Sequence, residues 1–174
     1  MVKRFDLKPV GDYQTQQCKL FAEYSTESSL EMYKDRNQLD EHKIFKDIFT
    51  GKLAEYMVYN YFIERNVNVS TPDLNIYNSN RKSYDADIRV DDIGIHVKSH
   101  EVNEIYPISW VFQKNDPLVL HRDDSTYLCL VVFNGAENYM YIVQVKEVDF
   151  KEPIKEKLRE TKVCLYERDI EGHE

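Results

Sequence analysis

The spacing of apolar residues along the chain changes near residue 65, from a helical repeat to a strand-like repeat. From about residue 14 to residue 65 the apolar positions follow helical spacing, and the stretch after Thr50 is the most regular. Its apolar residues recur at steps of one and three and form one broad stripe: Leu53, Ala54, Met57, Val58, Tyr61 and Phe62. We therefore predict a helix over 51–65 with Thr50 as its N-cap.

Beyond residue 65, short apolar runs alternate with polar residues, as they do in β-strands. Residues 84–90 and 93–98 alternate on either side of a turn at 91–94, which predicts a β-hairpin. Short β-like pieces are expected within 67–77, strands at 108–112, 127–133, 139–148 and 163–166, and a short helix after Pro153. The runs 127–133 and 139–148 are apolar enough to be central strands.

This order of elements predicts a single domain over 1–174 of the α/β, or layered α+β, class, with a central mixed sheet flanked by helices. Extra N-terminal helices fill 1–49, the core spans 50–150, and a helix and a strand fill 151–174. A chain of 174 residues with 42% hydrophobic residues is long enough for one real core and short for two.

The chain is acidic, with a formal net charge of −8, and most of the excess lies between residues 51 and 150. Nucleic-acid affinity comes largely from neutralising phosphates, so this balance argues against a general nucleic-acid coat protein. Carboxylates gathered in one segment are, however, what a divalent cation requires. The charge therefore leaves a metal-dependent nuclease open.

One face of the predicted hairpin carries polar side chains from both strands: Asp85, Asp87, Arg89, His96, Lys98 and His100. The opposite face is aliphatic. With a turn centred on Asp92, Asp87 is expected to lie roughly across from Lys98. Such a face can hold a divalent metal ion and place a lysine beside the water that the ion activates. Surface hairpins also present charged residues to solvent without any function, and that interpretation stays open.

These residues resemble the core motif of the PD-(D/E)XK nuclease superfamily, which has a restriction-endonuclease-like core. In that family an Asp begins one strand, and an acidic residue, any residue and Lys end the next. Here Asp87 is followed by Lys98 within the sequence IHVKS, and Glu55 lies in a helix that resembles the family's first core helix. Over about 50–148, the resemblance implies catalytic Asp87, His96, Lys98 and Glu55. It also implies Mg²⁺ or Mn²⁺ bound by Asp87, Glu55 and His96.

The sequence departs from the family pattern in two places. Tyr84 and Ala86, rather than proline, precede the two aspartates, and His96 holds the second acidic position. Imidazole suits manganese, iron or zinc better than magnesium. Either Glu55 and Asp85 supply the missing charge, or the cation preference shifts, or the site is inactive.

Three functions remain open at this stage. The first is a metal-dependent DNA endonuclease of the restriction or phage type, in which Lys98 is catalytic. The second is a catalytically silent nuclease-like fold that binds DNA or another protein, which His96 in the acidic slot favours. The third is a zinc- or manganese-dependent hydrolase of small substrates that uses His96, His100 and Asp87.

The first function is the one we expect, with DNA as the partner. Cutting both strands requires two sites, so we expect a homodimer. Gln113, after the strand at 108–112, is an additional candidate for contacting phosphate or the attacking water. Arg81 and Lys82 would border the site. Three widely spaced cysteines, no membrane-spanning run and no signal-peptide pattern at the start predict a cytoplasmic protein that does not bind membranes.

Overall fold

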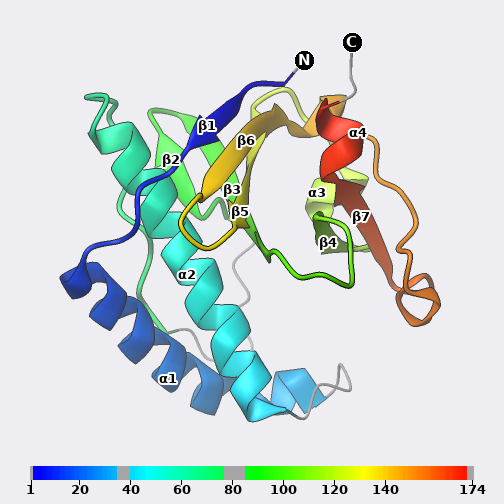
Figure 1. Cartoon of the computed structure of the whole chain (residues 1–174), viewed down its shortest axis with the longest axis horizontal. Helices are drawn as coiled ribbons and strands as arrows, with labels where there is room; N and C mark the ends of the chain where they lie inside the picture. The colour runs from blue at the N-terminus through cyan, green and yellow to red at the C-terminus, as the bar shows by residue number, and fades with distance from the viewer. Residues whose placement is uncertain (1, 35–39, 77–84, 172–174) are drawn as a thin grey trace.

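A computed structural model describes residues 2–34, 40–76 and 85–171 as a layered α/β domain (Figure 1). The elements are β1 Arg4–Asp6, α1 Asp12–Lys34, α2 Glu41–Ile63, β2 Ile88–Val90, β3 Ile93–Glu101, β4 Ser109–Gln113, α3 Pro117–Leu120, β5 Thr126–Phe133, β6 Tyr139–Gln144, the 3₁₀ turns η1 Val145–Glu147 and η2 Glu156–Leu158, β7 Lys162–Tyr166 and α4 Glu167–Glu171. The predicted mixed central sheet with helices against it is confirmed.

The central sheet has five strands in the order β1-β6-β5-β3-β2. Strand β3 is parallel to β5, and the other neighbouring pairs are antiparallel. Parallel neighbours require a crossover connection, which here contains β4 and α3. Strand β4 leaves the central sheet and pairs with β7 in a separate two-stranded sheet.

Each face of the central sheet has its own core. On one face, α2 packs Ala54, Met57 and Val58 against β2, β3 and β5. On the other face, the β4–β7 sheet and α4 cover β5 and β6, with Trp110 buried at the centre. Strand β5 is buried from both sides, which explains why its sequence is an unbroken apolar run.

Helix α2 begins earlier than the sequence predicted, and Thr50 lies inside it. The N-cap is Asp40, whose side chain accepts a 3.0 Å hydrogen bond from the backbone N–H of Lys43. Ile44 in the first turn is buried, so the apolar face continues upstream of the stripe. Helix α1 runs beside α2 (Figure 1), and reciprocal amide hydrogen bonds between Gln14 and Asn60 join them.

Smaller differences concern element ends. Strand β2 begins at Ile88, and residues 67–76 contribute only an isolated bridge from Val69 to Val90. The helix expected after Pro153 is the 3₁₀ turn η2. All three cysteines are buried and unpaired, as expected. Within the described residues, no helix combines the length and apolar character needed to span a bilayer.

Candidate active site

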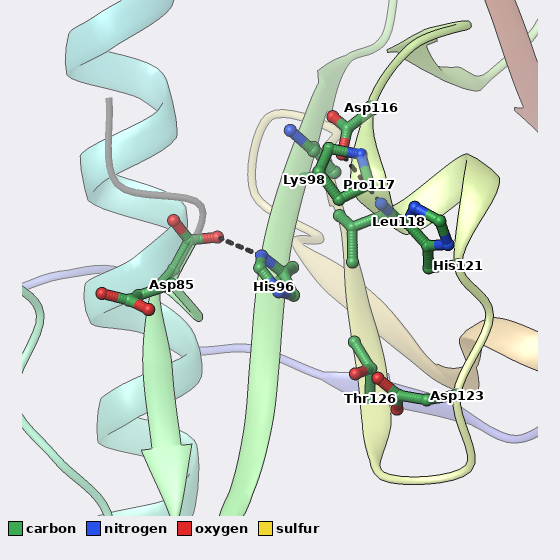
Figure 2. A pocket seen from close by; sticks show the side chains of 10 residues that line it. Asp85, His96, Lys98, Asp116, Pro117, Leu118, His121, Asp123 and Thr126 are labelled. Carbon is green, nitrogen blue, oxygen red and sulfur yellow. Dashed lines mark hydrogen bonds and ion pairs between the residues drawn. The ribbon is translucent and has the colours of Figure 1, made fainter. Parts of the chain in front are cut away.

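A cavity of about 280 Å³ opens beside the first half of β3 (Figure 2). The residues that line it are Asp85, Asp87, His96, Lys98, Asp116, Pro117, Leu118, His121, Asp123 and Thr126. Three of the four catalytic residues implied by the resemblance, Asp87, His96 and Lys98, therefore share one cavity. Asp85, one of the two additional candidates, also lines the cavity.

Strand alternation places His96 and Lys98 in this cavity. Ile95 and Val97 are buried under α2, so the residues between and after them point to the opposite face. That face is covered in part by the β4–β7 sheet, and the His96 side chain is only 15% exposed. The face of the hairpin that carries His96 and Lys98 is consequently not a fully solvated surface.

The hairpin register pairs Ile88 with Ile95 and so brings Asp87 next to His96, not across from Lys98 as the sequence predicted. The turn is centred between Asp91 and Asp92, and Asp91 takes a φ of 50°. One carboxylate oxygen of Asp87, Oδ2, accepts a 2.8 Å hydrogen bond from the backbone N–H of Val97 and lies 4.0 Å from His96 Nδ1. This hydrogen bond holds the Asp87 side chain immediately before β2.

Burial lowers the pKa of His96, and the positive charge of Lys98 lowers it further, while the Asp87 carboxylate opposes both effects. The imidazole is therefore neutral near pH 7. A neutral imidazole is the form that binds metal ions.

The Lys98 ammonium group lies 5.5 Å from the centre of the Phe112 ring, which β4 contributes. This distance is within the range of a cation–π interaction. The ring thus helps to position the ammonium group. Lys98 is consequently a cation in the same cavity as Asp87 and His96.

Glu55 is buried, with an exposed fraction of 8%, and is not among the described residues that line the cavity. Its Oε2 atom forms an ion pair with Lys52 Nζ at a distance of 2.7 Å. Helix α1 packs nearby, with the Phe21 ring 4.7 Å from Lys52 Nζ. Burial raises the pKa of Glu55 to about 7; Lys52 opposes this rise and the nearby charge of Asp87 adds to it.

The opposite wall of the cavity comes from α3 and the loop before β5, and the sequence did not predict it (Figure 2). Asp116 caps α3 through a 3.0 Å hydrogen bond from Leu118 N–H. A hydrogen bond from the Thr126 side chain, together with those from Ser125, lowers the pKa of Asp123. The sequence signals were the Asp-Pro pair at the start of α3 and the Asp-Asp-Ser turn before β5. Only the parallel β3–β5 pairing shows that this loop meets His96.

Two further candidates lie away from this cavity. Gln113 ends β4 and is not among the described residues that line it. His100 Nδ1 is 2.8 Å from the carbonyl oxygen of Ser109, its Nε2 is buried without a hydrogen-bond partner, and it too is not among these lining residues. A site that combines His96, His100 and Asp87 is therefore not formed. Arg81 and Lys82 lie outside the described residues.

The described part of the chain holds no group of three His, Cys, Asp or Glu side chains arranged for a metal ion. Asp87 and His96 are adjacent, but Glu55, the third ligand that the resemblance implies, is paired with Lys52. Two carboxylates and a neutral imidazole suit Mn²⁺ in their chemistry. Their arrangement here lacks the third ligand at the cavity.

Comparison of the chain with protein-family models, curated proteins and solved structures found no match. The PD-(D/E)XK resemblance therefore rests on the motif residues alone.

Proposed function

We propose that this protein is a divalent-metal-dependent endonuclease that hydrolyses phosphodiester bonds of DNA. The observation that carries the proposal is the convergence of Asp87, His96 and Lys98 in one cavity. Asp87 immediately precedes β2, and the other two residues lie in β3. No requirement of the hydrophobic core explains a lysine and an imidazole facing two aspartates there.

The chain's own residues have separate roles in this proposal. Asp87 and His96 supply an oxygen and a nitrogen donor, and the hydrogen bond from Val97 leaves Asp87 further lone pairs for a cation. Lys98 places a positive charge where the scissile phosphate gains negative charge during attack. A bound cation would polarise the phosphoryl oxygen and lower the pKa of its water ligand.

The charge of the cavity also supports a cation requirement. Its described lining includes four aspartates, at 85, 87, 116 and 123, against the single lysine Lys98. A phosphodiester group approaching these carboxylates without a counter-ion would be repelled. Cleavage on both strands would use two copies of the site, so the active form in this proposal is a homodimer.

A second candidate function is a catalytically silent fold that binds DNA or another protein. The observation that favours it is that the described residues contain no group of three His, Cys, Asp or Glu side chains arranged for a metal ion, while Glu55 pairs with Lys52. In this case Lys98 contributes no more than a surface charge.

Single-turnover cleavage of plasmid DNA with Mn²⁺ or Mg²⁺ separates the two candidates. We expect Lys98→Ala to slow cleavage by about 10²-fold or more, because it removes a positioned charge from the transition state. DNA binding should change little, since one lysine supplies a small share of the phosphate contacts. Melting curves should show a folded protein, because the core side of β3 is Ile95 and Val97.

Two controls sharpen this experiment. Lys98→Met keeps a long unbranched side chain but removes the charge, and it should slow cleavage equally. Lys114→Ala removes an exposed lysine beyond β4 and should cleave like wild type. Unchanged cleavage in Lys98→Ala would remove this cavity from the reaction. If wild type cleaves no duplex, branched or single-stranded DNA with either cation, the silent fold is the better description.

A further inference from the structure

Three cavities follow one another along β3, and neighbouring cavities share lining residues. Lys98 lines both the acidic cavity of the candidate site and a second cavity of about 460 Å³ between β3, α2 and β4. His100, Ser109 and Val111 line both the second cavity and a third cavity of about 320 Å³. The three cavities are therefore neighbours, and we call this line of cavities the β3 groove.

The groove lies beside the part of β3 that extends past β2. Within the described residues, β2 pairs with β3 only from Ile93 to Ile95, and β4 pairs with β7 outside the central sheet. The rest of β3, up to Glu101, borders the second cavity together with α2 and β4. From His96 to Glu101 the strand spans roughly 17 Å, at about 3.3 Å per residue. This length matches about five phosphates of a stacked DNA strand, at about 3.4 Å each, and fewer of an extended one.

The charge of the lining changes along the β3 groove. The described lining of the acidic cavity has four aspartates and one lysine, whereas that of the third cavity has Lys43 and Lys155 and no carboxylate. In the second cavity, ion pairs with Lys43 and Lys46 offset the charges of Asp47 and Glu101. A polyanion is therefore repelled by the aspartates at one end and attracted by a lysine at the other.

The third cavity also offers an aromatic surface next to a cation. Tyr106 lines this cavity and is 39% exposed, and Lys155 Nζ lies 3.8 Å from the centre of its ring. Ile154, which lines the same cavity, is 49% exposed. Proteins bind single-stranded nucleic acids through this combination, because the bases stack on aromatic rings while cations attract the phosphates.

We propose that the β3 groove binds single-stranded DNA, with a phosphate at Lys98 and an unpaired base at Tyr106. This inference rests on the proposed function of the same site and names its substrate class. The burial of the site supports an unpaired strand. The His96 side chain is only 15% exposed, and a paired and stacked strand does not reach a recessed group. Negative supercoiling favours local opening of a duplex, so plasmid DNA remains a substrate.

The test is fluorescence anisotropy with a labelled single strand of mixed sequence and with its blunt duplex. EDTA is present, so binding is measured without a metal ion and without cleavage. We expect the single strand to bind roughly tenfold more tightly than the duplex, because only its bases are free to stack on Tyr106.

Two variants test the two ends of the contact at the third cavity. Tyr106→Leu should weaken single-strand binding by roughly tenfold, whereas Tyr106→Phe keeps the ring and should bind like wild type. Lys155→Gln should reduce the slope of log K against log salt by about 0.7, as expected for the loss of one phosphate contact. Tyr106 belongs to neither core, so melting curves should show that these variants are folded.

The matched controls are Tyr24→Leu and Lys19→Gln. Both residues are exposed on α1 and are not among the described residues that line the three cavities. Both controls should bind the single strand like wild type. Equal affinity for single strand and duplex would overturn the inference. So would unchanged single-strand binding in Tyr106→Leu, an equal loss in Tyr106→Phe, or an equal loss in Tyr24→Leu.

Cleavage of the same strand with Mn²⁺ keeps this inference separate from the proposed function. If wild type binds the strand through Tyr106 but does not cleave it, the endonuclease is overturned and the β3 groove stands as a DNA-binding surface. If DNA is cleaved through Lys98 while Tyr106→Leu binds the single strand like wild type, the groove is overturned and the endonuclease stands.

Discussion

Two carboxylates, one on α2 and one on a loop that lines the cavity, are in opposite electrostatic situations. Glu55, on α2, is buried, and burial raises its pKa to about 7. On the α3 side, Asp123 is exposed at a loop, and hydrogen bonds from Thr126 and Ser125 lower its pKa. Glu55 is thus desolvated and ionises less readily than an ordinary carboxyl group, whereas Asp123 ionises more readily.

The difference shows that the surroundings, rather than the type of side chain, decide what each carboxylate can do. A desolvated carboxylate binds a nearby cation strongly because the interaction is little screened. A solvated carboxylate whose lone pairs are already used by local hydrogen bonds holds a turn in place. Glu55 accordingly holds the Lys52 ammonium group, and Asp123 holds the turn before β5.

The largest expected effect concerns Glu55 and pH. Its folded-state pKa of about 7 exceeds the ordinary value of 4.5. Glu55 thus binds its proton more tightly in the folded state than in the unfolded state. The resulting stabilisation is fully present below about pH 4.5 and is lost as pH rises through 7. Between about pH 5 and about pH 8, wild type should lose ~2–3 kcal/mol of unfolding free energy relative to Glu55→Gln. Urea denaturation of both proteins at the two pH values measures the difference.

Comparison within each protein across pH removes the constant cost of the substitution, which includes the Lys52 partner left behind. A difference between wild type and Glu55→Gln that stays constant from about pH 5 to about pH 8 would contradict the raised pKa. Glu55 would then ionise as readily as Asp123 does at neutral pH.

An intermediate effect on stability is expected from removal of the N-caps of α2 and α3. Asp40→Ala removes the cap of a 23-residue helix and should cost ~1 kcal/mol of unfolding free energy. Asp116→Ala removes the cap of a four-residue helix and should cost ~0.5 kcal/mol. Thr50→Ala, inside α2, should stay within ~0.5 kcal/mol of wild type. Thermal unfolding tests all three, and a cost at Thr50 as large as at Asp40 would place the helix start near residue 50.

The smallest effect is expected at Asp123. Its lowered pKa means that its stabilising contribution is present above its ordinary value of 3.8 and lost as pH falls through the folded pKa. The stability difference between wild type and Asp123→Asn should therefore stay constant from about pH 5 to about pH 8. It should change only below about pH 4. A stability difference that changes with pH near neutrality would contradict the lowered pKa of Asp123.

The elements with regular apolar spacing could be predicted from the sequence. The stripe of α2, the alternation of Ile95 and Val97, and the double-sided burial of β5 follow from local patterns, and the structure has all three. The helix start was missed because Thr50 resembled a cap, whereas Asp40 caps the helix upstream. Local signals for a cap compete along a chain, and packing against the sheet decides among them.

The site was predictable only on the side of the hairpin. Asp87, His96 and Lys98 are close in sequence, so alternation alone placed them on one face. The observed register of the hairpin is shifted relative to the predicted one, because the turn is centred between Asp91 and Asp92 rather than on Asp92. Asp116 and Asp123 could not be assigned, since only the pairing of distant strands brings their loop to β3.

The parallel pairing of β3 with β5 also determines when the cavity comes into being as the chain folds. It joins residues as distant in sequence as Gly94 and Thr126, and such non-local contacts form slowly because a long loop must close first. The hairpin can form early from its own turn. The wall that faces it takes its place only when β5 pairs with β3. The acidic cavity is therefore a property of the finished fold, and a nascent chain that ends before β5 presents Asp87, His96 and Lys98 without it.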